Sequence, residues 1–248
     1  MKIREKSRSK EGIPLLILAF ETSAKACSAA LHDGTKLLAE SMQNSGLTHS
    51  QTLMVMAEDL LKVCGTTPAD VTALAVAAGP GSFTGVRIGV SAAKGFAWGA
   101  EKPVYGVSTL EAMALGLGIS EGCICACMDA RRNQVYNAIF LVKNGALTRI
   151  RADRAISLEE LRQELPQYQT PIYLVGDGAA LAHKHLSPAI PGLVLPPEHR
   201  VHQRASGVAL AALEAINRGD SGDCAALQPN YLRLSQAERE RLEKMQNA

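Results

Sequence analysis

The order of secondary-structure signals, which occurs twice along this chain, is the feature that most constrains its fold. The first half has β-like runs at 15–20, 27–32 and 35–42, a helical pattern at 50–64, an apolar strand at 73–78, a helix at 86–100 and a strand at 103–107. After a helix at 109–117, the second half has strands at 123–129, 134–142, 147–154 and 171–175, helices at 157–165, 178–185 and 203–218, and a short apolar stretch near 193–195. Asp33-Gly34 and Asn144-Gly145 are strong hairpin signals. Two successive β-β-β-α-β-α units predict two lobes, each a mixed sheet with helices on its faces.

Charge and apolar content indicate where the domains begin and end. We expect a disordered N-terminal extension at 1–12, a first lobe at 13–108, a second lobe at 109–234 and a charged tail at 235–248. The extension is basic and almost free of apolar side chains, so it cannot contribute to a core. Glu and Arg at helix-pairing distances favour a solvated helix over 237–245 in the tail.

The overall composition is that of an ordinary globular protein. A chain of 248 residues with 47% hydrophobic and 20% charged residues can bury one large core or two modest ones. The formal charge of +2 gives no strong electrostatic case for nucleic-acid binding by the chain alone. No apolar run approaches the roughly 18 residues of a membrane span, so we expect a cytoplasmic protein. Cys123, Cys125 and Cys127 alternate along one strand without a Cys-x-x-Cys pair, which favours buried thiols over a zinc site.

A glycine-rich loop connects the strand at 73–78 to the helix at 86–100. Glycine permits close approach of a ligand or of another backbone, so Gly79, Gly81 and Gly85 mark a specialised loop. A helix that begins after such a loop can hold an anion. The loop lacks the Lys of a Walker A motif, and its spacing is one residue too long for a dinucleotide fingerprint. Phosphate contact and a simple packing turn both remain open.

Four segments in this order resemble the signatures of the TsaB (YeaZ) family. They are the glycine loop at 79–89, the strand and turn at 17–23, the hairpin at 128–136 and the segment Pro229-Asn230-Tyr231-Leu232-Arg233, and together they span roughly residues 15 to 238. The resemblance implies the two-lobed fold of the actin, sugar kinase and Hsp70 (ASKHA) superfamily, with two RNase H-like mixed sheets. It also implies a non-catalytic partner of the TsaD transferase, which adds threonylcarbamoyl groups to tRNA.

In that superfamily a nucleotide lies between the lobes, held by turns that this chain alters. Asp129 is followed by Arg131 and Arg132 where relatives have glycines, and Asp177 separates the glycines of the adenosine loop. These changes argue against ATP hydrolysis, and we expect no cofactor for this chain alone, with ATP or ADP and a divalent metal in the partner subunits. The candidate nucleotide or phosphate contacts are Glu21, Thr22, Ser23, Gly79, Gly81, Ser82, Thr84, Gly85, Asp129, Gly176 and Gly178, and the candidate tRNA contacts are Arg131 and Arg132.

The TsaD relatives hold a metal with two histidines four residues apart, a spacing that places both on one helix face. Thr109 and Met113 stand at those positions here, and neither supplies an imidazole. His199 and His202 are three apart in a proline-rich stretch, which favours a structural or surface role. The sequence therefore predicts no metal site.

The helices at 50–64 and 86–100 are apolar on more than one side. They are either deeply buried or partly covered by a partner. The family resemblance favours the partner, because TsaB proteins pair with TsaD through these helices and self-associate as homodimers when it is absent. The candidate partner-binding residues are Leu53, Met54, Met56, Ala57, Leu60, Val86, Val90, Ala93 and Ala97.

The leading functional hypothesis is a scaffold subunit that binds a TsaD-type transferase and enables transfer of the threonylcarbamoyl group to an anticodon-loop adenosine. A TsaE-type ATPase is the implied third partner, and tRNA is contacted through the complex. The alternative is a stand-alone ATP-dependent phosphotransferase of the same superfamily.

Overall fold

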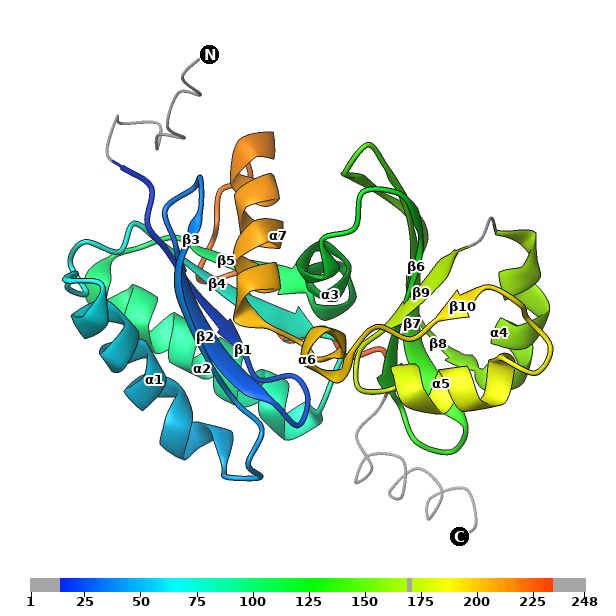
Figure 1. The fold of residues 1–248 in the computed structure, drawn as a ribbon. Coiled ribbons are helices and arrows are strands. Elements are labelled where there is room, and N and C mark those ends of the chain that lie inside the picture. The colour runs from blue at the N-terminus through cyan, green and yellow to red at the C-terminus, as the bar shows by residue number, and fades with distance from the viewer. Residues whose placement is uncertain (1–13, 169–170, 234–248) are drawn as a thin grey trace, which may run out of the picture.

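The structure is a computed structural model that describes residues 14–168 and 171–233. The expected N-terminal extension at 1–12 and the charged tail at 235–248 lie outside these residues. The described chain forms two lobes, each built on a five-stranded sheet (Figure 1). None of the helices within the described ranges is long and apolar enough to cross a membrane.

The first sheet has the strand order β3-β2-β1-β4-β5. Its strands are β1 (Ile17–Glu21), β2 (Cys27–His32), β3 (Leu37–Gln43), β4 (Ala73–Gly79) and β5 (Val104–Ser108). The pairs β1–β2 and β2–β3 are antiparallel, whereas β1–β4 and β4–β5 are parallel. Helices α1 (His49–Val63) and α2 (Phe83–Ala100) cover one face, and α7 (Ala205–Arg218) covers the other (Figure 1).

The second sheet repeats this topology. Its strands are β6 (Gly122–Asp129), β7 (Gln134–Lys143), β8 (Ala146–Ser157), β9 (Ile172–Val175) and β10 (Leu193–Val194), in the order β10-β9-β6-β7-β8. Helices α4 (Leu158–Glu164) and α5 (Ala179–Leu186) and the 3-10 turn η1 (Leu165–Gln167) cover one face, and α3 (Thr109–Leu117) covers the other. A short helix, α6 (Glu198–Val201), precedes α7. Two equivalent mixed sheets with flanking helices confirm the predicted two-lobed ASKHA-type fold.

Both faces of the first sheet are buried, so β1 shows no polar alternation. Leu18 and Phe20 pack toward α1 and α2, whereas Ile17 and Ala19 pack toward α7. All four side chains are fully buried. A strand that is covered on both faces has a nearly continuous run of apolar residues, and β1 has such a run in the sequence.

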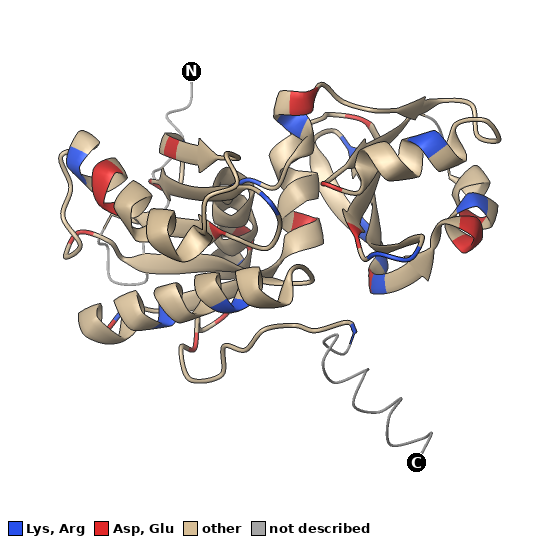
Figure 2. Ribbon diagram, turned by 90° about the horizontal axis from the view of Figure 1, so that it is seen from below, with Lys and Arg blue, Asp and Glu red and all other residues tan. Residues whose placement is uncertain are grey.

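The last helix belongs to the first lobe, not to the second. Helix α7 packs on β1, β2 and β4 and adds its alanines to the core behind them. The segment after it runs along the first lobe beside α2 (Figure 2), where Asn230 N–H donates to Ala78 O at 2.6 Å and Lys94 Nζ donates to Leu227 O at 3.0 Å. The boundary that assigned 109–234 to the second lobe is therefore wrong for residues 205–231. An alanine-rich helix fits either sheet, so chain order alone could not decide which one it covers.

Several helix ends have identifiable caps. Ser82 accepts a hydrogen bond from Gly85 N–H, so α2 begins three residues before the apolar pattern suggests. Ser157 and Glu160 form a reciprocal capping box at α4. The N-terminus of α7 is capped from the sheet instead, because Ser28 Oγ accepts from Ala205 N–H and Glu40 Oε1 accepts from Ser206 N–H.

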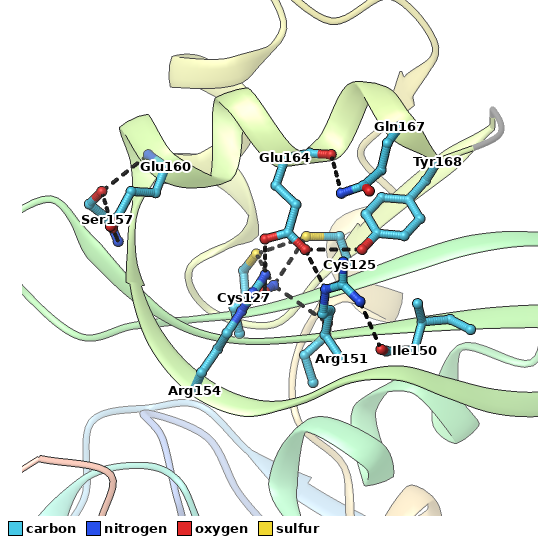
Figure 3. A network of polar contacts seen from close by, with 12 residues as sticks. Cys125, Cys127, Ile150, Arg151, Arg154, Ser157, Glu160, Glu164, Gln167 and Tyr168 are labelled. Carbon is cyan, nitrogen blue, oxygen red and sulfur yellow. Dashed lines mark hydrogen bonds and ion pairs between the residues drawn. The ribbon is translucent and has the colours of Figure 1, made fainter.

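A polar network ties α4 to the second sheet (Figure 3). Glu164 Oε1 accepts hydrogen bonds from Arg151 Nε at 2.7 Å and Tyr168 Oη at 3.0 Å, and Oε2 accepts from Arg154 Nη2 at 2.6 Å. Arg154 Nη2 also donates to Asn137 Oδ1 at 3.1 Å. Burial alone would raise the pKa of Glu164, but the hydrogen bonds from Arg151, Arg154 and Tyr168 lower it.

The three alternating cysteines are buried free thiols, as the pattern predicted. Burial raises the pKa of Cys123 to about 12. The neighbouring Cys127 thiol and burial hold the pKa of Cys125 well above its ordinary value. The thiols of Cys123 and Cys125 are therefore protonated at neutral pH and act as small apolar side chains.

Candidate functional site

The glycine-rich loop packs directly against the turn that follows β1. Ser82 N–H donates to Ser23 O at 2.7 Å, and Thr22 Oγ1 donates to Gly85 O at 2.7 Å. A Cβ atom added at Gly81 would lie 2.5 Å from Ser23 O, and one at Gly85 would lie 2.1 Å from Thr22 O. Backbone contact between two loops of the same lobe therefore accounts for these glycines, which is the packing-turn alternative.

The corresponding loop of the second lobe uses glycine in the same way. An added Cβ at Gly176 would lie 2.2 Å from Cys127 O, and one at Gly178 would lie 2.8 Å from Asp129 N. Asp177 between them accepts a hydrogen bond from Gln203 Nε2 at 2.9 Å. Burial raises the pKa of Asp177.

A cleft of about 430 Å³ lies between the two lobes. It is lined by Ser23, Ala24, Lys25, Gly81, Ser82, Phe83, Met128, Asp129, Ala130, Arg131, Tyr136, Asp177, Asn230, Tyr231, Leu232 and Arg233. Both lobes and the C-terminal segment contribute, so the cleft forms only in the assembled fold. Three cationic and two acidic side chains are among the lining residues.

Most of the predicted nucleotide contacts are inaccessible, which corrects that prediction. Seven of the eleven are buried, and they are Glu21, Thr22, Ser23, Gly79, Gly85, Gly176 and Gly178. Ser23 still borders the cleft, together with Gly81, Ser82 and Asp129. Thr84 lies instead on the outer face of α2. Because the glycines contact the protein's own backbone and the Thr22 hydroxyl bonds Gly85, these loops do not fit a nucleotide held as in the superfamily.

Glu21 is a fully buried carboxyl at the floor of this region. Its Oε1 accepts from Ser23 N–H at 2.6 Å, while its Oε2 has no hydrogen-bond partner among the described residues. Burial raises the pKa of Glu21 to about 7, and hydrogen bonding to Ser23 offsets only part of that effect. Glu21 therefore titrates near neutral pH.

No group of three His, Cys, Asp or Glu side chains in residues 14–168 and 171–233 is arranged to hold a metal ion. Thr109 and Met113, which the family resemblance places at the histidine positions of TsaD, are both buried on α3. His202 pairs with Glu198 at 3.0 Å on the surface of α6.

The outer face of α1 and α2 carries an apolar groove of about 510 Å³. It is lined by Ser50, Leu53, Met54, Phe83, Thr84, Arg87, Ile88, Ser91 and Ala92. Met54 is 43% exposed there, and Val55 beside it is 56% exposed. A groove of this kind on a monomer surface is typical of an interaction site.

The candidate partner-binding residues need correction, because all of them except Met54 are buried in the monomer's own core. These eight are Leu53, Met56, Ala57, Leu60, Val86, Val90, Ala93 and Ala97. The apolar pattern marked the inward face of each helix. The second stripe of α2, which contains Ile88 and Ala92, was the signal for the outward face.

An aromatic and cationic stack at one end of the groove was not predicted. The rings of Phe83 and Tyr231 stack with centroids 4.9 Å apart, and the Arg87 guanidinium carbon lies 3.8 Å from the Phe83 centroid. Arg87 Nε also donates to Tyr231 Oη at 2.7 Å. Because 144 residues separate Arg87 from Tyr231, no local pattern could have revealed their contact.

The paired sheets, the cleft between them and the outward-facing helices define a two-lobed protein of the actin-like class. The family model described as "TsaD: tRNA N6-adenosine threonylcarbamoyltransferase" matches residues 39–240. The tRNA threonylcarbamoyladenosine biosynthesis protein TsaB of Bacillus subtilis is 33% identical over 226 residues, which cover 90% of this chain and 96% of that protein. The chain belongs to the TsaB (YeaZ) family, as its sequence motifs predicted.

Two further relatives agree with this assignment. The TsaB protein of Escherichia coli is 39% identical over 166 residues, which cover 65% of this chain and 71% of that protein. The solved structure of YeaZ from Pseudomonas aeruginosa superposes with a TM-score of 0.77 at 26% identity, covering 88% of this chain and all of that one.

Proposed function

We propose that this chain is a non-catalytic subunit in tRNA threonylcarbamoyladenosine biosynthesis that pairs with a TsaD-type transferase through the groove on α1 and α2. The pathway is the one named for its TsaB relatives. The exposed apolar groove on α1 and α2 supports the choice of this surface for pairing. Without the transferase, the same surface joins two copies of the chain.

A scaffold role agrees with the chemistry of the cleft better than a phosphotransferase role. The loops that would hold phosphates are packed against their own lobe, and Asp129 and Asp177 would repel the phosphates of a nucleotide. We therefore expect the purified chain alone to show no ATP turnover. Turnover above the background of a mock preparation would favour the phosphotransferase.

The test is a reconstituted modification reaction containing tRNA, the threonylcarbamoyl donor, the cognate TsaD-type transferase and the TsaE-type ATPase. Adding the wild-type chain should raise formation of the modified adenosine. Met54→Lys should lose this stimulation, because it places a charge in the groove. Val63→Lys is the matched control, because Val63 is 81% exposed on the same helix but does not line the groove.

If both variants stimulate modification equally, the groove is not the pairing surface. If modification proceeds at full rate without the chain, the proposed role of the chain as a subunit is wrong.

A further inference from the structure

Arginine side chains in residues 14–168 and 171–233 divide into two groups by their partners. Most of them pair with a carboxylate, namely Arg149, Arg151, Arg154, Arg162, Arg204 and Arg218. Those without such a pair within this part of the chain are Arg87, Arg131, Arg132, Arg200 and Arg233. Arg200 donates to Leu117 O at the other side of the lobe junction.

The remaining four gather around the mouth of the cleft. Arg131 and Arg233 line it, and Arg132 follows Arg131 in the exposed β6–β7 turn. Arg87 bonds to Tyr231, which also lines the cleft. Lys25, exposed after β1, adds a fifth cation. Four of the five arginines without a carboxylate pair in this part of the chain thus lie in or beside one cleft, although the net charge of the whole chain is only +2.

The β6–β7 turn is held in place while its arginines stay exposed. Arg131, Arg132 and Asn133 all have left-handed backbone conformations, with φ of 66°, 55° and 55°. Asp129 Oδ1 accepts from Arg131 N–H at 2.8 Å, and Arg233 Nη1 donates to Ala130 O at 2.6 Å. The turn is thereby joined to the C-terminal segment that carries Tyr231.

From these contacts we propose that the cleft mouth binds the phosphate backbone of a structured RNA. Lys25, Arg131, Arg132 and Arg233 contact phosphates, and the exposed side chain of Tyr231 offers an aromatic surface on which an unpaired base can stack. Figure 2 shows basic residues on both lobes and at the end of the C-terminal segment. The RNA proposal extends the proposed function, since the RNA would be the tRNA substrate presented to the transferase.

An extended RNA fits this surface better than a free nucleotide. The cations come from both lobes and the C-terminal segment, and Arg132 extends them beyond the residues that line the cleft. Asp129 and Asp177 also line the cleft, and they would repel a compact polyphosphate bound inside it. Successive phosphates of an RNA strand can instead contact cations of both lobes and of the C-terminal segment.

The test measures binding of a fluorescent tRNA transcript over a series of salt concentrations, both to the chain alone and to its complex with the transferase. The variant is Arg131→Asn with Arg132→Asn, because Asn tolerates left-handed conformations. The control is Lys143→Asn with Lys184→Asn, which removes the same charge from exposed sites of the same lobe away from the cleft. Melting temperatures should match the wild type for both.

We expect the arginine variant to bind roughly tenfold more weakly at 100 mM salt, with the salt dependence of log K reduced by about one per arginine. The lysine control should bind like the wild type. Unchanged binding by the arginine variant, or equal weakening by the control, would overturn the proposal. Competition by free ATP through the same two arginines, at concentrations near the RNA affinity, would assign the site to a nucleotide instead. If no complex forms with the transferase, the proposed function fails, and the measurement on the chain alone still decides the RNA question.

Discussion

A methyl group at Gly85 would lie 2.1 Å from Thr22 O, and one at Gly89 would lie 2.4 Å from Thr22 Oγ1. Both glycines belong to α2, whose start is held against the β1–β2 turn by the Thr22 side chain. A side chain at Gly85 would require the backbone to move, whereas one at Gly89 would require the Thr22 side chain to shift. The glycines in the most recognisable segment of the sequence thus serve packing between a helix and a turn.

Gly85→Ala should therefore destabilise the protein by roughly 3 kcal/mol, because the added methyl group meets a backbone carbonyl that cannot move aside cheaply. Gly95→Ala is the matched control on the same helix, since no other atom lies within 4 Å of its added Cβ. The control should stabilise by roughly 0.5–1 kcal/mol through helix propensity. Urea unfolding of both variants checks this, and a Gly85→Ala protein as stable as the wild type would refute the packing explanation.

Glu21 predicts a pH dependence of stability with a definite sign. Its pKa is raised by burial from 4.5 to about 7, so the folded protein keeps a proton that the unfolded chain releases. The contribution of Glu21 to the free energy of unfolding should fall as the pH rises from about 4.5 to 7 and then level off. Glu21→Gln removes this contribution, so its stability relative to the wild type should rise by roughly 3 kcal/mol between pH 4 and pH 8. Urea unfolding at both pH values measures the difference, and parallel behaviour of the two proteins would contradict it.

At the scale of elements, the sequence predicts the existence and order of almost all helices and strands. Hairpin signals and apolar periodicity locate β2 and α3 at both ends. Both α1 and α2 are apolar on more than one side. Periodicity therefore cannot tell which apolar side of each helix faces the core. The placement of α7 on the first sheet and the Arg87–Tyr231 contact depend on long-range packing, so local sequence could not reveal them. The short α6 has too few residues to show a period.

The network around Glu164 predicts how α4 is held. Glu164→Gln should destabilise by about 2 kcal/mol at pH 7, because it weakens two charge-assisted hydrogen bonds from Arg151 and Arg154. The lowered pKa of Glu164 means that its contribution is present above the unfolded-state pKa and is lost as the pH falls through the folded-state pKa. The difference between variant and wild type should therefore shrink in acid. Glu159→Gln, at an exposed pair with Arg162, should destabilise far less than Glu164→Gln, and equal costs for the two variants would contradict the stabilising role of the network.

At the scale of the whole molecule, two equivalent sheets are joined by α3 and by the C-terminal segment. Both faces of the first sheet are already covered by helices, so the apolar groove on α1 and α2 is surface beyond what the monomer's core requires. The loops beside the cleft are packed against their own lobes. The described residues therefore offer an apolar interaction surface on the exterior of the first lobe, which supports the proposed subunit role.

The most direct test of this account is the mass of the complex that the chain forms with its cognate TsaD-type transferase, measured by light scattering during size-exclusion chromatography. The account predicts a complex for the wild type and for Val63→Lys, and separate peaks for Met54→Lys at the same concentrations. A Met54→Lys protein that is folded and still forms the complex would contradict the central claim that the groove on α1 and α2 is the pairing surface.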